Sequence, residues 1–228
     1  MSYLEYAQEI IGKYAEIDAK KRDQLVDSVK NLEVKRVLDV GCGAGQQLIP
    51  FAEKKNAFCV GIDIGEELGQ VGNAFIESFG FSGKICFARA KGEELPFEDE
   101  SFDVVLCLVA LPYMHNKKTL AETARVLRPG GVYLLKTHAP AFYFGMLKRR
   151  FRTFDLRQYA YPVICLINGI RHQLTGRQAQ DGFWRGKEVF QTKGFLTKEL
   201  KKHNLRIEGT LPDTNIQSPS FYIVKNLK

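Results

Sequence analysis

The stretch VLDVGCGAG, residues 37–45, decides the fold of this chain of 228 residues. An apolar run there breaks into glycines at alternate positions, directly before a segment that is compatible with a helix. Gly41, Gly43 and Gly45 have no Cβ, so the backbone can adopt positive φ and approach a ligand closely, while the following helix points free N–H groups at the same place. The stretch therefore predicts a strand, a tight turn and a helix N-terminus that bind a nucleotide-like ligand.

The composition is that of one globular domain over residues 1–228, with 45% hydrophobic and 26% charged residues. No run approaches the ~20 apolar residues of a membrane-spanning helix, and the N-terminal segment lacks the pattern of a signal peptide. We therefore expect a cytoplasmic protein. The cysteines lack C-x-x-C and C-x-x-H spacing, so we expect neither disulfides nor a metal site from Cys42, Cys59, Cys86, Cys107 and Cys165.

The net charge of +7 is concentrated in the C-terminal third of the chain. Residues 1–138 contain 17 Lys and Arg against 20 Asp and Glu, whereas residues 139–228 contain 16 against 6. Such a basic region can face a phosphate, a carboxylated substrate, nucleic acid or an anionic membrane, or it can be an ordinary solvated surface.

Short apolar strands alternate with helices along most of the chain. Two helices are expected within residues 1–33, the second over 19–31. Strands are expected at 36–40, 58–62, 85–88, 104–108, 132–137, 205–211 and 220–225, and further helices at 44–55, 66–79, 117–127 and 197–203. The sequence RPGG at 128–131 is expected to end a helix before the next strand. This alternation predicts an α/β fold, a doubly wound and mostly parallel seven-stranded sheet with helices on both faces.

Between residues 139 and 191 the pattern loosens into a segment rich in aromatic and basic side chains. The aromatic residues are Phe142, Tyr143, Phe144, Phe151, Phe154, Tyr159, Tyr161, Phe183 and Trp184, and the basic residues are Lys148, Arg149, Arg150, Arg152, Arg157, Arg171, Arg177 and Arg185. We interpret the segment as an insertion after the fifth strand that forms a substrate lid over the C-terminal edge of the sheet. An amphipathic molecule with an anionic group suits such a lid, and so does RNA. The alternative is a plain helical cover whose aromatic side chains pack onto the core.

Four landmarks in this order resemble those of class I S-adenosylmethionine-dependent methyltransferases, over roughly residues 14–137 and the closing strands. They are VLDVGCGAG at 37–45, GIDI at 61–64, AKGEELPFEDESFDVVLCLVALPYM at 90–114 and ARVLRPGGVYLL at 124–135. The third is similar to the branch of the family that acts on small molecules. The resemblance implies a Rossmann-like sheet and S-adenosyl-L-methionine as the cofactor.

The resemblance also implies which residues contact the cofactor. The glycine turn of Gly41, Gly43 and Gly45 is expected to cradle the methionine portion, and Asp39 is expected to lie near its cationic ammonium group. Asp63 is expected to accept hydrogen bonds from the ribose diol. Ile64 is expected to pack on the adenine. Gly92, Glu93 and Leu108 are the other residues expected to contact the cofactor.

Lys91 departs from the family pattern, because many relatives have an aspartate there that accepts a hydrogen bond from the adenine amino group. A lysine cannot accept one. The backbone of Gly92 and Glu93, or the Glu93 side chain, is the alternative contact.

The candidate catalytic residues follow the fourth and fifth strands, where ligands bind in open α/β sheets. They are Tyr113, His115 and His138. A histidine can take a proton near neutral pH, which is needed only if the methyl acceptor is a protonated nucleophile such as a hydroxyl. His115 can instead be an exposed loop residue. The sequence LPY at 111–113 lacks the first polar residue of the N/D-P-P-Y motif, which disfavours a nucleobase or protein amide as acceptor.

The sequence thus predicts an S-adenosylmethionine-dependent methyltransferase that acts on a small-molecule or lipid-like, anionic acceptor. Whether its basic region contacts an anionic membrane peripherally, RNA or only the substrate stays open at this point. An RNA (tRNA) methyltransferase and a catalytically inactive cofactor-fold binding protein are the alternatives. A nicotinamide dehydrogenase fits less well, because the third glycine comes one position too early for G-x-G-x-x-G.

Overall fold

A computed structural model describes residues 9, 14, 16, 18–65, 68–150, 157–178 and 187–227; of these, the side chains of residues 68–70, 150, 157 and 158 are not described. The expected first helix lies almost wholly outside the described residues. So do several residues of the expected lid, namely Phe151, Arg152, Phe154, Phe183, Trp184 and Arg185, and the side chains of Arg150 and Arg157.

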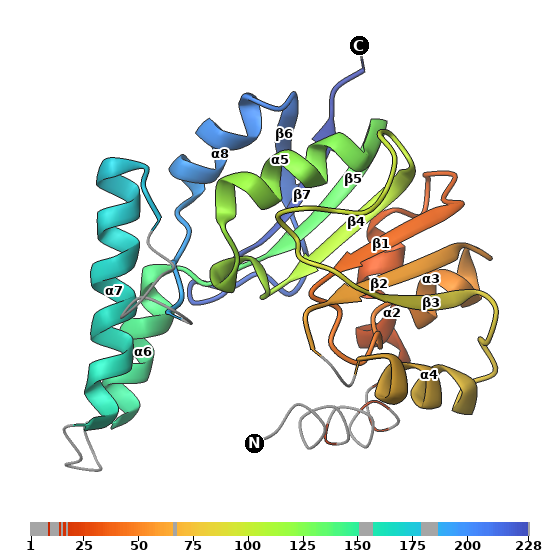
Figure 1. The fold of residues 1–228 in the computed structure, drawn as a ribbon, viewed down its shortest axis with the longest axis horizontal. Coiled ribbons are helices and arrows are strands. Elements are labelled where there is room, and N and C mark those ends of the chain that lie inside the picture. Colours follow the sequence, from red (N-terminus) through yellow and green to blue (C-terminus); the bar gives the residue numbers. More distant parts are fainter. Residues whose placement is uncertain are drawn as a thin grey trace.

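In the described part of the chain, seven strands form one sheet in the order β3-β2-β1-β4-β5-β7-β6 (Figure 1). The strands are β1 (Arg36–Val40), β2 (Phe58–Asp63), β3 (Ile85–Arg89), β4 (Phe102–Leu108), β5 (Leu127–Lys136), β6 (Leu205–Thr210) and β7 (Ser220–Lys225). Strands β1 to β5 are parallel, and β7 is antiparallel to both of its neighbours. The predicted α/β fold, a doubly wound and mostly parallel seven-stranded sheet, is confirmed.

Helices cover both faces of this sheet, since alternate strand residues point to opposite sides. Val37 of β1 belongs to the core that includes residues of α2 (Ala19–Ser28), α3 (Ile49–Lys54) and α4 (Leu68–Ser78). Its neighbour Leu38 belongs to the core on the other face, with residues of α5 (Asn116–Val126) and α8 (Lys193–Lys201). The two cores explain why the strands read as nearly continuous apolar runs.

Two expected boundaries are wrong. The helix expected from residue 44 begins at Ile49, because Gly45 has a φ of +77° and residues 46–48 form turns before Pro50 enters the first helical turn. The RPGG sequence does not precede a strand but lies within β5. Gly130 has a φ of +74°, and the pairing of β4 with β5 shifts register between Phe102 and Val104, so the strand bulges there.

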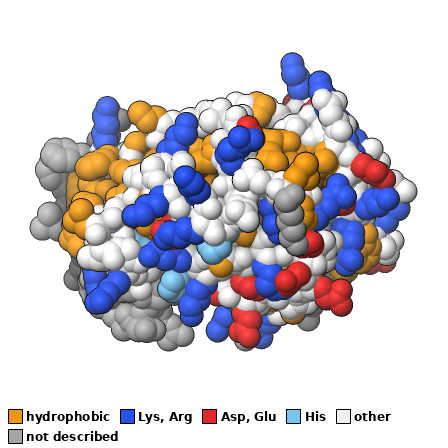
Figure 2. All heavy atoms as spheres, turned by 90° about the horizontal axis from the view of Figure 1, so that it is seen from above, with side chains coloured by type: hydrophobic (Ala, Val, Ile, Leu, Met, Phe, Trp, Pro, Cys, Tyr) orange, Lys and Arg blue, Asp and Glu red, His pale blue; other side chains and the backbone are white. Residues whose placement is uncertain are grey.

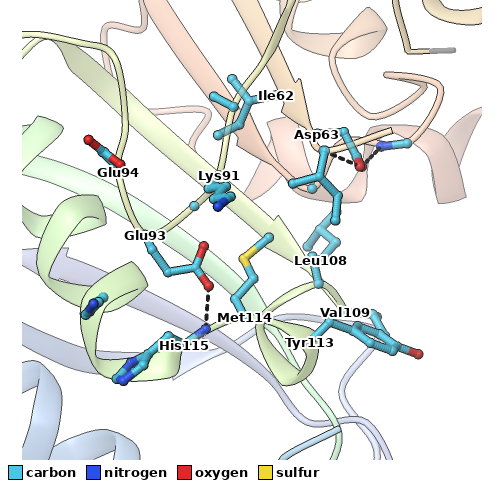
Figure 3. Close-up of a pocket in the computed structure, with 17 residues that line it drawn as sticks. Ile62, Asp63, Lys91, Glu93, Glu94, Leu108, Val109, Tyr113, Met114 and His115 are labelled. Atoms are coloured by element: carbon cyan, nitrogen blue, oxygen red, sulfur yellow. Dashed lines mark hydrogen bonds between the residues drawn. The ribbon is translucent and has the colours of Figure 1, made fainter. Parts of the chain in front are cut away.

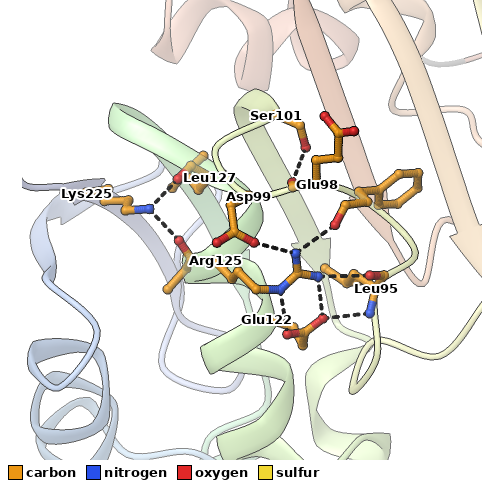
Figure 4. A network of polar contacts seen from close by, with 10 residues as sticks. Leu95, Glu98, Asp99, Ser101, Glu122, Arg125, Leu127 and Lys225 are labelled. Carbon is orange, nitrogen blue, oxygen red and sulfur yellow. Dashed lines mark hydrogen bonds and ion pairs between the residues drawn. The ribbon is translucent and has the colours of Figure 1, made fainter.

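The loop between β3 and β4 is fastened to α5 by Arg125 (Figure 4). The guanidinium donates to the carbonyl oxygens of Leu95 (2.9 Å) and Phe97 (2.7 Å). It also donates to the carboxylates of Asp99 (2.9 Å) and Glu122 (2.7 Å). Glu122 in turn accepts from the backbone N–H of Leu95 at 2.8 Å. These contacts fix residues 94–101, the ELPFEDES sequence, against α5. They therefore also restrain the residues just before it, Lys91, Gly92 and Glu93.

The segment after β5 forms α6 (Pro140–Arg150) and α7 (Arg157–Thr175), a helix pair that stands at one end of the molecule (Figure 1). Tyr143, Cys165 and Phe190 form a small core of their own there. Among the described residues no helix is long and apolar enough to span a bilayer.

Candidate functional site

A pocket of about 880 Å³ opens where β1, β2 and β4 end (Figure 3). The predicted cofactor residues that line it are Gly41, Gly43, Asp63, Ile64, Gly92, Glu93 and Leu108, and the predicted catalytic residues that line it are Tyr113 and His115. Lys91, Glu94, Met114 and Lys118 line it as well. We refer to it as the first pocket.

A second pocket of about 530 Å³ adjoins the first. It shares Gly41, Gly43, Leu108 and Val109 with the first pocket, and its other lining residues include Tyr14, Lys21, Arg22, Asp39, Gln46, Lys136 and Asp213. One ligand lying across the glycine turn can therefore reach both pockets.

The glycine turn depends on the absence of side chains. Gly41 has a φ of +76°, and a Cβ on it would lie 2.3 Å from the Cβ of Ala110. Gly45 has a φ of +77°, but it lines neither pocket; a Cβ there would lie 2.6 Å from the ring of Phe87. The missing side chain of Gly41 thus lets the turn lie close to Ala110 beside the pockets, whereas that of Gly45 lets the turn pack on Phe87 of β3.

Asp63, at the end of β2, organises the turn through its carboxylate. One oxygen accepts from the N–H of Gly43 (3.2 Å), and the other accepts from the N–H groups of Ile64 (2.7 Å) and Gly65 (3.1 Å). A carboxylate has about four acceptor positions, so these bonds orient the group and leave room for a ligand hydroxyl.

Asp39, at the end of β1, is the most unusual group of the site. Its side chain is buried, with the residue 2% exposed, and its Oδ1 has no hydrogen-bond partner among the described residues. Burial first, and then the negative charge of Asp63, raise the pKa of Asp39 to about 7. An unpaired buried carboxylate is costly, and a cation placed beside it relieves that cost. Asp39 lines the second pocket, so the site fits a ligand that carries a cationic group there.

Val109 lies where the two pockets meet and has a φ of +69°, which is strained for a β-branched side chain. Its N–H donates to the carbonyl oxygen of Lys136 at 2.8 Å, which holds the conformation in place. Strained backbone of this kind costs about 1–3 kcal/mol and concentrates at functional sites.

Tyr113 and His115 lie on different sides of the first pocket (Figure 3). Partial burial of the Tyr113 hydroxyl, and then the charge of Glu188, raise the pKa of Tyr113, so this hydroxyl remains a donor at neutral pH. The N–H of His115 donates to Oε1 of Glu93 at 2.6 Å, and its Nδ1 is buried without a partner in the described structure. The Glu93 carboxylate is thus already engaged in holding the pocket wall.

His138 follows β5 as expected, but it lines neither pocket. Its Nδ1 lies 2.6 Å from Oε2 of Glu188, and its ring stacks on Phe142 with 3.6 Å between centroids. Glu188 also accepts from the hydroxyls of Tyr143 (2.9 Å) and Tyr161 (2.6 Å). Burial alone would raise the pKa of Glu188, but the hydrogen bonds from His138, Tyr161 and Tyr143 outweigh it and lower the pKa. The structure therefore places His138 in a buried junction between β5 and the helix pair.

The residues that sequence reasoning missed belong mainly to the second pocket. Lys136 pairs with Oδ2 of Asp213, while Oδ1 of Asp213 and Oε1 of Gln46 are buried without a partner among the described residues. Lys136 ends the fifth strand, so the rule that identified His138 could have identified it. Asp213 lies in a loop between the last two strands, where no local pattern distinguishes it.

The described part of the predicted lid contributes no residue to either pocket. Its helices α6 and α7 pack on each other around Tyr143 and Cys165. The described arginines of this segment, Arg149, Arg171 and Arg177, therefore line neither pocket.

Comparison with known proteins relates part of the chain to methyltransferases. Residues 37–131 match the family described as "Methyltransferase domain". An uncharacterized methyltransferase, YcgJ, of Bacillus subtilis is 36% identical over 104 residues, which are 45% of this chain and 40% of that protein. The 27-O-demethylrifamycin SV methyltransferase of Amycolatopsis mediterranei is 37% identical over 97 residues, 42% of this chain and 36% of that protein.

Each of these matches thus spans less than half of the relative's length. The solved structure of magnesium protoporphyrin IX methyltransferase from Synechocystis with bound SAH aligns with a TM-score of 0.62 at 18% identity, over 91% of this chain and 83% of that one. At this identity the structural match shows a common fold.

Proposed function

We propose that the chain is a class I S-adenosylmethionine-dependent methyltransferase, since residues 37–131 match the family described as "Methyltransferase domain", and that it transfers a methyl group from S-adenosyl-L-methionine to a small, acidic molecule. The observation that carries the proposal is the buried Oδ1 of Asp39 beside the glycine turn, which has no hydrogen-bond partner among the residues that the structure describes. The cofactor carries an ammonium group, which can donate a charge-assisted hydrogen bond to such an oxygen.

The residues of both pockets fit the parts of this cofactor. Asp63 lines the first pocket and retains acceptor capacity for ribose hydroxyls. Asp39 and the backbone of Gly41 and Gly43 suit the methionine portion. Bound there, the cofactor supplies an activated methyl group on a sulfonium. The protein's task is then to align the acceptor and to exclude water.

The part of the second pocket that the methionine portion leaves free suits the acceptor. The whole pocket has a volume of about 530 Å³, within the usual range for small-molecule sites of about 300–1,000 Å³. Lys21 and Arg22 bring positive charge to it, which favours an acidic molecule. The names of two relatives, which include 27-O-demethylrifamycin SV and magnesium protoporphyrin IX, also indicate small molecules.

Asp213 is placed to hold an acceptor hydroxyl. Its Oδ2 is paired with Lys136, and its Oδ1 is buried, unpartnered in the described structure and part of the second pocket. A hydroxyl that donates to Oδ1 would be oriented beside the glycine turn and would have a proton acceptor in reach. His138 is not needed for this role, since it faces Glu188.

Calorimetric titration of the full chain with S-adenosylmethionine and S-adenosylhomocysteine, with NAD as the control, tests the proposal. Micromolar binding of the first two without the third is expected. Absence of binding by the folded chain contradicts it. Transfer of labelled methyl to hydroxylated small molecules with and without a carboxylate, with tRNA as the comparison acceptor, then tests the acceptor class. Faster transfer to tRNA contradicts the small-molecule proposal.

A further inference from the structure

One face of α7 exposes a continuous row of aliphatic side chains. The exposed fractions are 41% for Val163, 52% for Ile167, 51% for Ile170 and 81% for Leu174. At 100° per residue these positions fall within an arc of about 60° on the helix. We call these four residues the α7 ridge. Monomeric proteins rarely expose contiguous apolar patches larger than a few hundred Å², and such patches with polar residues around them mark protein or membrane interaction sites.

The opposite face of α7 is firmly packed. Cys165, Asn168 and His172 are buried, and Gly169 lies so close to Phe190 that a Cβ would stand 2.2 Å from its ring. The helix is thus already formed and held before anything covers the ridge. A surface helix of this kind does not have to fold when it binds, so the entropy cost of binding is small.

The charge around the ridge identifies the kind of partner. Between residues 139 and 178 the sequence contains a single acidic residue, Asp155, and its basic residues are Lys148, Arg149, Arg150, Arg152, Arg157, Arg171 and Arg177. Of the side chains that the structure describes, Lys148, Arg149, Arg171 and Arg177 are exposed. Figure 2 shows hydrophobic side chains gathered at the end of the molecule where α6 and α7 stand, with Lys and Arg side chains beside them. An aliphatic ridge with basic flanks is typical of helices that lie in the interface of an anionic membrane.

The side-chain types separate this partner from two others. Single-stranded RNA is bound by several exposed aromatic rings on which bases stack, whereas the ridge is aliphatic and Phe144 is the one largely exposed aromatic side chain among the described residues of α6 and α7. A second copy of the chain would bring a second basic helix pair against the first, which like charges oppose. We therefore propose that the α7 ridge docks this protein on an anionic lipid surface, independently of the methyl transfer proposed above.

Co-sedimentation of the full chain with vesicles tests the proposal. Vesicles of phosphatidylcholine with about 30 mol% phosphatidylglycerol are compared with phosphatidylcholine alone, at low salt and at about 0.5 M salt. We expect binding to the anionic vesicles that weakens with salt. The double variant Ile167→Ser with Ile170→Ser should bind them at least about tenfold more weakly, because both aliphatic groups leave the interface. Ile216→Ser is the matched control, since Ile216 is 82% exposed but lies outside the ridge.

Circular dichroism shows whether each variant is folded, and cofactor titration shows whether the pockets are intact. Equal binding by the double variant and the native chain overturns the proposal, and so does the absence of binding to anionic vesicles. Sedimentation equilibrium and binding of a labelled RNA are measured on the same variants. A dimer or an RNA complex that only the double variant loses would assign the ridge to those partners instead.

Discussion

Replacing Asp39 with Asn should make the protein without cofactor more stable at pH 7 and above while weakening its binding of S-adenosylmethionine. In the folded chain the pKa of Asp39 is about 7, against an ordinary value of 3.8, because the carboxylate is buried and close to Asp63. A raised pKa in the folded state means that stability is full below pH 3.8 and is lost as the pH rises toward about 7. At 1.36 kcal/mol for each pH unit, the complete loss is at most about 4 kcal/mol.

The Asn variant does not ionise, so it does not undergo this loss. Its amide leaves donors without partners, which costs about 1–3 kcal/mol at every pH. The difference between the free energies of unfolding of the variant and the native chain should therefore rise by about 2 kcal/mol from pH 5.5 to 7 and then level off. Urea unfolding at pH 5.5, 7.0 and 8.5 measures this difference. Subtracting the free energy of unfolding of one protein from that of the other cancels the contribution of groups that titrate in both.

Cofactor affinity should change in the opposite direction. The variant loses a charge-assisted hydrogen bond to the ammonium group, so calorimetry should show binding about 10- to 100-fold weaker. The affinity of the native chain for the cofactor should also increase as the pH rises toward 7, because only the ionised carboxylate attracts the cation. The affinity of the variant should lack this increase. A difference in stability that does not depend on pH, or an unchanged affinity for the cofactor, would refute the role assigned to Asp39.

Other substitutions test the remaining parts of the site. Asp63→Ala should weaken S-adenosylmethionine binding by roughly 1–3 kcal/mol in calorimetry, and unchanged affinity would remove Asp63 from the site. Gly41→Ala should abolish cofactor binding, because its backbone has a φ of +76° and lacks room for a Cβ, whereas Gly194→Ala, with nothing within 4 Å, should bind normally. Arg125→Ala should lower the free energy of unfolding by about 2–4 kcal/mol in urea, and Arg125→Lys should recover only part of it, because a lysine cannot make the forked contacts. Equal stability of the Ala and Lys variants would contradict that reading of the network.

The sequence predicted those parts of the fold and site that depend on local pattern. Gly41 was identified from the glycine spacing after a strand, Asp63 was identified from the resemblance to class I methyltransferases, and both line the first pocket. His138 was identified from its place after the fifth strand, but a local pattern cannot show that its Nδ1 lies against Glu188, fifty positions later. Lys136 and Asp213 of the second pocket were missed for the same reason, because Asp213 meets Lys136 only after the last two strands have been added to the sheet.

Three costly features of the described structure lie at the second pocket. Asp39 and Asp213 each hold a buried oxygen without a partner in the described residues, and Val109 holds a strained backbone. Each costs free energy in the protein alone, and each lies where a cofactor or acceptor would supply the missing contact. The sheet that carries them is closely packed on both faces, with Leu38 and Leu106 fully buried, so it can sustain this cost. Binding should accordingly stabilise this chain more than its contact area alone suggests, because it removes penalties as well as adding contacts.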